Sequence, residues 1–289
     1  MLIVSCSHGN HLGHSIAKRL NASHSQLTVN KFPDDEILIK FNSNLKNQVV
    51  VLVQSFYKDI SDCLIEVILA SATAKEFGAK KIILVAPYFP YLRQDKRFHS
   101  GESVSQGIIA GLIDKYFDSV YVMDPHLHRK NSLNQIFKIK STKLTANDLI
   151  ADYIQKNIKN PILIGPDSES YKWARNVAEK IGAESRILTK KRYSSYHVEV
   201  RLNKKVDLRN RNVVIVDDIV STGHTIIEAS KLLRRLGAKN IYCICVHGIF
   251  VEDALRKFAK NKIKVISTNT IPNKAAKIDV SGMIADTLS

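Results

Sequence analysis

The chain of 289 residues is long enough for two domains of ordinary size, and its composition, 45% hydrophobic and 24% charged, is that of a globular protein. No apolar run approaches the roughly 20 residues that a membrane-spanning helix needs, and no signal peptide is apparent, so we expect a cytoplasmic protein without a membrane partner. The formal charge is +16, but the basic residues are spread along the chain, which argues against a nucleic-acid partner.

A unit of strand, helix, turn and strand occurs twice along the chain. In the first copy the apolar run 49–53 leads through a helical pattern to the turn 78–80 (GAK), and in the second the run 213–216 leads to 237–239 (GAK). Because each glycine ends a helix before an Ile-containing strand, both copies predict a βαβ unit and a parallel sheet. The predicted fold class is therefore α/β, with two tandem homologous domains, each a mainly parallel sheet flanked by helices.

We expect these domains to cover residues 1–142 and 143–289. The copies differ where their first strand ends. The second has two aspartates followed by a hydroxyl-rich turn, whereas the first has QSFYKD at 54–59, without paired carboxylates or a glycine. The N-terminal copy is thus predicted to be a degenerate domain with another task.

In the N-terminal half, a polar and cationic loop follows the strand predicted at 82–85. It carries Arg93 and Gln94 and ends where GESVS at 101–105 opens the next helix. An arginine can bind a phosphate through two parallel hydrogen bonds, and a glutamine offers both a donor and an acceptor to an adenine edge. The alternative is a solvated loop stiffened by prolines.

In the C-terminal half, a predicted strand at 161–165 precedes Asp167, at the strand end where α/β sheets bind ligands. The alternative for Asp167 is a cap on the following helix. Further on, Lys190 and Arg192 lie in a polar stretch between a strand ending near Leu188 and a strand at 198–200, as expected of a lid. The alternative for these cations is a solvated hairpin.

The most informative segment is 213–225, in which four β-branched residues run into Asp217 and Asp218, followed by the turn STGHT at 221–225 and a helical pattern. The hydroxyls of this turn, its glycine and the start of the helix favour a phosphate. Carboxylates instead hold ribose hydroxyls or hydrated Mg²⁺. The combination predicts a phosphorylated sugar as ligand. A buried strand with a capping hydroxyl would not account for the paired aspartates.

This segment resembles the phosphoribosyl-pyrophosphate loop of type I phosphoribosyltransferases and ribose-phosphate pyrophosphokinases. Four more segments match the pyrophosphokinases in the same order, namely KFPDDE at 31–36, RQDKR with GESVS at 93–105, MDPH at 123–126 and KKR at 190–192. The chain is identified as a member of this family, most similar to its archaeal-type branch, with two domains of type I phosphoribosyltransferase-like fold. Ser221 and His224 depart from the residues usual in bacterial members.

The resemblance implies a ribose-phosphate diphosphokinase, which transfers the β,γ-pyrophosphoryl group of ATP to the C1 hydroxyl of ribose 5-phosphate. The products are 5-phosphoribosyl 1-pyrophosphate and AMP, for nucleotide biosynthesis. It also implies Mg²⁺ as cofactor and a homodimer or higher homo-oligomer whose ATP site is shared between subunits. Such a transfer depends on in-line positioning and neutralised charge more than on covalent chemistry.

Each matching residue acquires an expected role from the resemblance. Lys190 and Arg192 would be catalytic, within a lid at 189–198, and Arg192 would also contact ribose 5-phosphate. The residues expected to bind ATP are Phe32, Asp34, Asp35, Glu36, Arg93 and Gln94. Those expected to bind ribose 5-phosphate along the loop 217–225 are Asp217, Asp218, Ser221, Thr222, Gly223, His224 and Thr225. The expected metal ligands are His126 and Asp167.

Three alternatives share the fold. A phosphoribosyltransferase would not explain RQDKR or the acidic segment at 34–36. A non-catalytic relative would be expected to lack the cations Lys190 and Arg192, which are present. A nucleic-acid-binding repressor would need an added basic helix-turn-helix domain.

Overall fold

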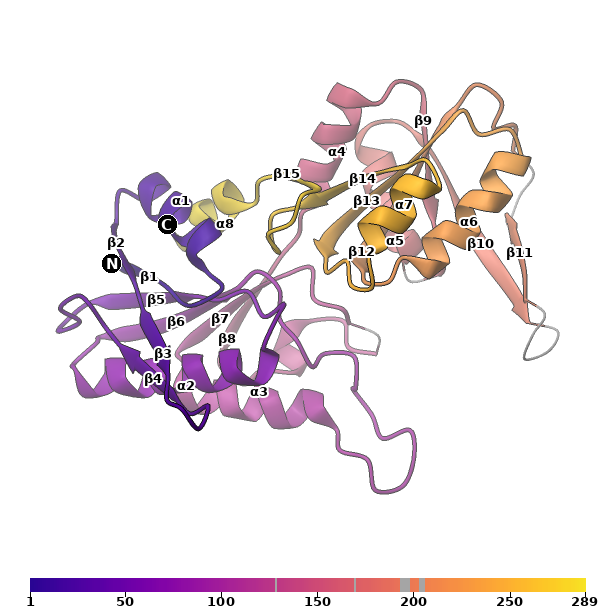
Figure 1. Ribbon diagram of the computed structural model, residues 1–289. Coiled ribbons are helices and arrows are strands. Elements are labelled where there is room, and N and C mark those ends of the chain that lie inside the picture. Colours follow the sequence, from indigo (N-terminus) through magenta and orange to yellow (C-terminus); the bar gives the residue numbers. More distant parts are fainter. Residues whose placement is uncertain (128, 169, 193–197, 203–205) are drawn as a thin grey trace. The chain divides into compact units, whose positions relative to one another are not determined.

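The computed structural model describes residues 1–127, 129–168, 170–192, 198–202 and 206–289 (Figure 1). The chain forms two compact units, residues 1–145 with 280–289 and residues 146–279. The division expected after residue 142 falls within strand β8 (Lys140–Leu144). Val280–Ser289, which we expected in the C-terminal domain, belong to the first unit.

The first unit contains a six-stranded parallel sheet with the strand order β2-β1-β5-β6-β7-β8. Besides β8, its strands are β1 (Leu2–Ser5), β2 (Ser23–Gln26), β5 (Val49–Val53), β6 (Lys81–Ala86) and β7 (Ser119–Met123). Its helices are α1 (Asn10–Arg19), α2 (Ile60–Glu76), α3 (Ser105–Tyr116) and the short η1 (Leu133–Gln135). The central strands are buried almost throughout, as continuous Val/Ile runs predict for a sheet covered on both faces.

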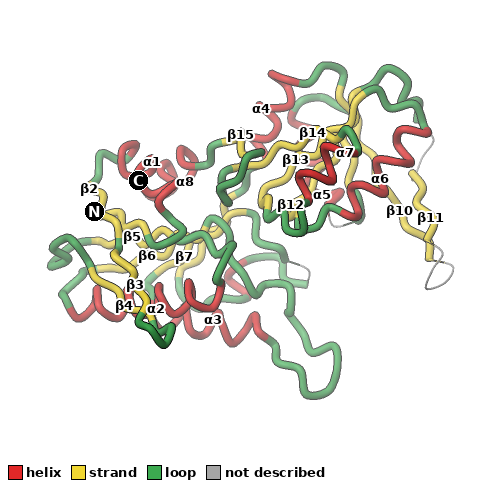
Figure 2. Tube along the Cα trace, viewed as in Figure 1, coloured by secondary structure: helices red, strands yellow, loops and turns green. Residues whose placement is uncertain are grey.

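Two further elements complete this unit. A hairpin of β3 (Thr28–Lys31) and β4 (Ile37–Lys40) packs against α2, and Lys31 forms an ion pair with Asp62 at 2.6 Å. The C-terminal helix α8 (Ser281–Leu288) lies against α1 (Figure 2). It buries Ile284 and Leu288, so the end of the chain is part of the first unit's core.

The second unit has a seven-stranded sheet with the order β11-β10-β9-β12-β13-β14-β15. All neighbours are parallel except β10 and β11, which form an antiparallel pair. The strands are β9 (Pro161–Gly165), β10 (Glu184–Arg192), β11 (Val198–Leu202), β12 (Asn212–Val220), β13 (Asn240–Gly248), β14 (Ile263–Thr268) and β15 (Ala276–Ile278). The helices are α4 (Asn147–Asn157), α5 (Ser170–Lys180), α6 (His224–Arg235) and α7 (Ala254–Lys260).

The predicted fold class is confirmed, because both units contain a mainly parallel sheet flanked by helices. The carboxyl ends of β9 and β12 are adjacent in the second sheet, and those of β1, β5 and β6 are adjacent in the first. In the part of the chain that the structure describes, no helix combines the length and apolarity needed to cross a membrane.

Candidate active site

The second unit contains a cavity of about 180 Å³ where β12 meets α6, and it is lined by Asp217 and residues 219–226. The predicted sugar-phosphate loop thus lines this cavity with all of its residues except Asp218. The strand continues further than its Val/Ile run suggested, so both aspartates lie within β12. Because α6 begins at His224, the amides of its first turn and the positive end of its dipole adjoin the cavity.

Asp218 is the predicted loop residue that does not line this cavity. Successive side chains of a strand point to opposite faces, so Asp217 and Asp218 cannot both face the ligand. The Asp218 side chain is 4% exposed, and its Oδ1 accepts a hydrogen bond from the Ile219 amide at 2.8 Å. Its charge therefore acts on the site from behind the strand.

Gly223 is required by packing as well as by backbone conformation. Its φ is +72°, in the left-handed region, and a Cβ placed there would lie 2.3 Å from Cζ of the Phe258 ring. Any side chain at this position would displace Phe258 or move the turn. The ring of Phe258, fully buried in α7, thereby sets the position of the turn 221–225.

Asp217 is held in place by its neighbours. Its Oδ1 accepts hydrogen bonds from the Ser170 hydroxyl at 2.7 Å and from the Asp218 amide at 3.0 Å. Burial raises the pKa of Asp217 well above its usual range, and the charges of Asp218 and Asp167 raise it further. Ligand hydroxyls that donate to this carboxylate, or a cation nearby, would offset the cost of its charge.

Asp167 has the hydrogen-bonding geometry of a helix cap, the alternative role that the sequence left open. Its Oδ1 accepts a hydrogen bond from the Ser170 amide at 2.9 Å, at the first residue of α5, and its side chain is exposed. The other expected metal ligand, half-buried His126, belongs to the first unit and follows β7. Among the described residues, no group of three or more His, Cys, Asp or Glu side chains could hold a metal ion. The assignment of metal ligands stays a prediction.

The cations predicted to be catalytic belong to a β-hairpin. We expected the strand to end near Leu188, but β10 continues to Arg192, and its register pairs Lys190 with Val200 and Arg192 with Val198. Hydrogen bonding between β10 and β11 therefore extends into the predicted lid. The side chains of Lys190 and Arg192, and residues 193–197 of the predicted lid, lie outside the described residues.

In the first unit, the loop that carries Arg93 and Gln94 is attached to the start of α3. The Ser105 hydroxyl donates to Gln94 Oε1 at 3.2 Å, and the Gln106 side-chain amide donates to the Leu92 carbonyl at 3.1 Å. Arg93 is exposed between these anchors. The loop is thus fixed by its backbone and leaves a cation facing solvent.

Asp95, in the same loop, has a role that was not predicted from the sequence. Its side chain is only 2% exposed, and its Oδ1 accepts a hydrogen bond from Nη1 of Arg129, three residues after His126. An acid set among the cations of RQDKR could have suggested such an internal ion pair. This pair joins the Arg93 loop to the segment that follows the predicted metal ligand.

The acidic segment forms the turn of the hairpin β3–β4. The Phe32 amide donates to the Glu36 carbonyl at 2.8 Å, and Asp35 adopts a left-handed conformation with φ of 69°. Asp34, Asp35 and Glu36 are exposed, and the Phe32 side chain is 49% exposed. The hairpin therefore presents an aromatic ring and three carboxylates to its surroundings.

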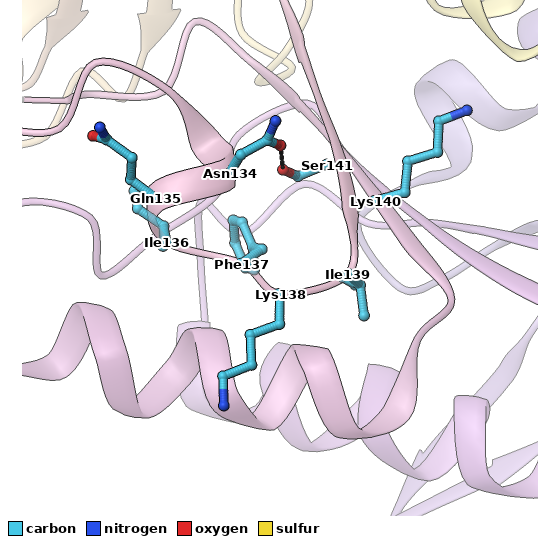
Figure 3. Close-up of a pocket in the computed structure, with 8 residues that line it drawn as sticks. All are labelled: Asn134, Gln135, Ile136, Phe137, Lys138, Ile139, Lys140 and Ser141. Atoms are coloured by element: carbon cyan, nitrogen blue, oxygen red, sulfur yellow. Dashed lines mark hydrogen bonds between the residues drawn. The ribbon is translucent and has the colours of Figure 1, made fainter.

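The first unit also has a cavity of about 670 Å³, lined by residues 134–141 between η1 and β8 (Figure 3). The Ser141 hydroxyl donates to Asn134 Oδ1 at 2.8 Å along its wall, and the side chains of Lys138 and Lys140 extend in different directions. None of the predicted site residues lines this cavity.

A parallel sheet that presents a carboxylate and a hydroxyl-rich turn beside a helix N-terminus is typical of phosphoribosyltransferase-type domains. Residues 1–116 match the family model described as the N-terminal domain of ribose phosphate pyrophosphokinase, and residues 132–281 match the phosphoribosyl transferase domain. These matches, together with the geometry, show that the chain is built from phosphoribosyltransferase-type domains.

Curated relatives match over the whole chain. Ribose-phosphate pyrophosphokinase of Methanothermobacter thermautotrophicus is 34% identical, with 99% of both chains covered, and that of Pyrococcus furiosus is 33% identical, with 97% of both covered. A solved structure, phosphoribosylpyrophosphate synthetase from Mycobacterium smegmatis, has a TM-score of 0.87 at 24% identity, covering 99% of this chain and 97% of that one, which supports the fold. The chain belongs to the ribose-phosphate pyrophosphokinase family. The family and enzyme class predicted from the sequence are confirmed.

Proposed function

We propose that this protein transfers the β,γ-pyrophosphoryl group of ATP to the C1 hydroxyl of ribose 5-phosphate, giving 5-phosphoribosyl 1-pyrophosphate and AMP in the cytoplasm. The observation that carries the proposal is the cavity formed by Asp217 and residues 219–226 in a member of this family. It combines one carboxylate for sugar hydroxyls with hydroxyls and a helix N-terminus for a phosphate.

In the proposed complex, the 5-phosphate lies in the turn 221–225 and the ribose 2- and 3-hydroxyls donate to Asp217. Ser170 holds Asp217 in the orientation needed for this contact. Asp218 does not touch the sugar, because its side chain is buried on the other face of β12. It acts by raising the pKa of Asp217, which increases the gain from ligand hydrogen bonds to that carboxylate.

ATP is proposed to contact Arg93 and Gln94 through the loop that α3 anchors. Its adenosine portion would contact Phe32, Asp34, Asp35 and Glu36 from a second subunit. The exposure of the hairpin turn supports this role, because the ring and the carboxylates are available to another chain. The proposal therefore includes a homodimer or a higher homo-oligomer.

Mg²⁺ is the proposed metal, held by Asp167 and His126. The exposed carboxylate of Asp167 suits a hard cation, and its contribution to the raised pKa of Asp217 indicates negative charge that a cation would balance. When bound, Mg²⁺ would neutralise charge on the ATP phosphates. Lys190 and Arg192 are proposed to close over the transferring group, where they would stabilise charge in the transition state and exclude water.

The test is an assay of the purified chain with Mg²⁺, ATP and ribose 5-phosphate, in which phosphorus NMR follows AMP and the new sugar pyrophosphate. We expect AMP to form only when ribose 5-phosphate is present. A protein that makes no AMP, yet consumes 5-phosphoribosyl 1-pyrophosphate with a base, would be a phosphoribosyltransferase. One that binds ATP and does neither would be a regulatory relative.

A further inference from the structure

Glu66, on the inner face of α2, is a buried carboxylate that the proposed mechanism does not use. Its side chain is 2% exposed. Oε1 accepts a hydrogen bond from the Ser7 amide at 2.8 Å, and Oε2 accepts from the Ser7 hydroxyl at 2.5 Å and from Nε2 of Gln54 at 3.1 Å. Both partners lie just beyond the carboxyl ends of adjacent strands, Ser7 after β1 and Gln54 after β5.

Strand register shows which residues of the second unit correspond to these partners. Lys81 directly follows the first GAK turn and pairs with Val49, and Asn240 directly follows the second GAK turn and pairs with Asn212. Val49 and Asn212 are therefore equivalent positions. Counting along the two strands from them, Gln54 corresponds to Asp217. In the same way, Leu2 pairs with Val50 and Ile162 pairs with Val213, so Ser7 corresponds to Asp167. The two carboxylates proposed for ligand and metal in the second unit are therefore neutral residues in the first.

The buried carboxylate is found in the copy that lacks those two acids. Glu66 is the seventh residue of α2, and the seventh residue of α6 is Ser230, whose hydroxyl donates to the Ile227 carbonyl of its own helix at 2.7 Å. The first unit thus directs Ser7 and Gln54 inward to a buried carboxyl group. In the second unit, Asp217 faces a cavity instead.

This hydrogen-bond network is connected to the loop proposed to bind ATP. The side-chain Oε1 of Gln54 accepts a hydrogen bond from the backbone amide of His8 at 2.8 Å. The backbone amide of Gln54 donates to the Val85 carbonyl of β6 at 3.0 Å. Two residues on, the Phe56 amide donates to the Tyr88 carbonyl at 3.0 Å, and the rings of Phe56 and Phe89 meet edge to face at 5.7 Å between centroids. The chain then leads directly from Phe89 to Arg93.

We infer that Glu66 is a positioning residue for ATP. Its carboxylate fixes Ser7 and Gln54 from inside, and through Phe56 it holds the segment 88–94 in place. This inference rests on the proposed function, because it takes Arg93 and Gln94 as the ATP contacts.

The test exchanges the acid and the amide. Both oxygens of Glu66 accept hydrogen bonds, whereas the side-chain amide in Glu66→Gln has one oxygen that accepts and one nitrogen that donates. At least one donor from Ser7 or Gln54 would therefore lose its acceptor. We expect KM for ATP to rise about tenfold while KM for ribose 5-phosphate stays unchanged. Gln54→Glu alone places two carboxylates side by side and should act similarly. The double variant restores one acid and one amide, since the carboxylate introduced at position 54 would accept hydrogen bonds from the His8 amide and from the side-chain amide introduced at position 66. It should return KM for ATP to near its original value.

Ser71→Ala is the matched control, because Ser71 is a fully buried residue of the same helix whose hydroxyl donates to the Tyr116 carbonyl, away from the network. It should lower stability without changing KM for ATP. Equal effects on both substrates, an unchanged KM in Glu66→Gln, or no rescue by the double variant would each overturn the inference. If the unaltered chain forms no AMP, the proposed function has failed, and ATP affinities of the same variants measured by calorimetry still decide the role of Glu66.

Discussion

Arg129 donates a hydrogen bond to the buried carboxylate of Asp95, and this contact ties the loop of Arg93 to the segment after His126. Arg129→Ala would leave Asp95 buried without its cation. Because the Arg129 side chain is half exposed, water would replace part of the interaction, so we expect a loss of about 1–2 kcal/mol in the free energy of unfolding. Chemical denaturation measures this loss.

The same variant should weaken ATP binding, because the loop would lose one of its anchors. We expect KM for ATP to rise about tenfold. The adjacent Lys130→Ala serves as a control. It should change the free energy of unfolding by no more than about 0.5 kcal/mol and leave KM for ATP nearly unchanged. If Arg129→Ala loses stability but keeps its KM for ATP, the ion pair supports the fold alone.

The two lysines at 190 and 191 test the hairpin cations. If Lys190 stabilises charge that develops in the transition state, Lys190→Ala should lower kcat by about 10²–10³ and leave ribose 5-phosphate affinity nearly unchanged. Lys191→Ala, a change of the same size and charge one residue along β10, should stay within about threefold of the unaltered enzyme. Rapid-quench measurement of AMP formation separates these outcomes. Equal effects of the two substitutions would show that net positive charge alone matters.

The packing of Gly223 against Phe258 predicts the effect of a single methyl group. Gly223→Ala adds a Cβ where the Phe258 ring lies 2.3 Å away, at a φ of +72°, so we expect a loss of about 2–4 kcal/mol and a raised KM for ribose 5-phosphate. Adding Phe258→Leu should relieve the overlap but not the left-handed backbone. Recovery of KM in the double variant, measured beside Phe258→Leu alone, would attribute the effect to packing. No recovery would attribute it to the backbone.

The parts of the site that follow the local rules of strands and turns could be predicted from the sequence. The run 213–216, the carboxylate of Asp217 and the turn 221–225 are adjacent in the chain, so their succession alone places the carboxylate and the turn at one site, and they do line one cavity. Asp218 shows the limit of that reasoning. Paired acids look equivalent in a sequence, whereas alternation along β12 directs them to opposite faces.

What the sequence could not reveal depends on contacts between distant segments. Asp95 and Arg129 are 34 positions apart, and Glu66 lies 59 positions from Ser7, so no local pattern indicates either contact. Likewise, the turn 221–225 contains a glycine for an evident reason, but the ring that excludes a side chain there comes from α7. The return of α8 to the first unit is equally a product of tertiary packing.

The raised pKa of Asp217 predicts an unusual dependence of stability on pH. An unfolded aspartate titrates at about pH 3.9, so between that value and the raised folded pKa the folded chain holds a proton that the unfolded chain has lost. The stability from protonated Asp217 is therefore complete below about pH 3.9 and is lost as pH rises through the folded pKa. Asp217→Asn removes this loss, keeps an acceptor for Ser170, and should make the chain more stable than the original by about 1–2 kcal/mol at neutral pH.

Urea denaturation at a series of pH values in EDTA would follow this difference, which should vanish near pH 4. The gain in stability should accompany a large rise in KM for ribose 5-phosphate. Asp207→Asn is a control of opposite sign, because hydrogen bonds from Arg209 lower the pKa of Asp207 to about 2. Its substitution should destabilise the chain at neutral pH, and this effect should fade as pH falls through about 2. A stability difference for Asp217→Asn that does not change with pH would contradict the predicted titration.

The packing of α8 against α1 predicts that a substitution near the C-terminus destabilises the N-terminal unit. Ile284 is fully buried, so Ile284→Ala should lower the free energy of unfolding of the first unit by about 2–4 kcal/mol. The single tryptophan, Trp173, lies on α5 and reports on the second unit. Far-ultraviolet circular dichroism reports on both units. The part of the dichroism transition that comes from the first unit should therefore occur under milder denaturing conditions, while the midpoint of the tryptophan fluorescence transition stays unchanged. Asp286→Ala, an exposed change on the same helix, should alter neither signal, and a shift of the fluorescence midpoint by Ile284→Ala would instead assign the C-terminal helix to the second unit.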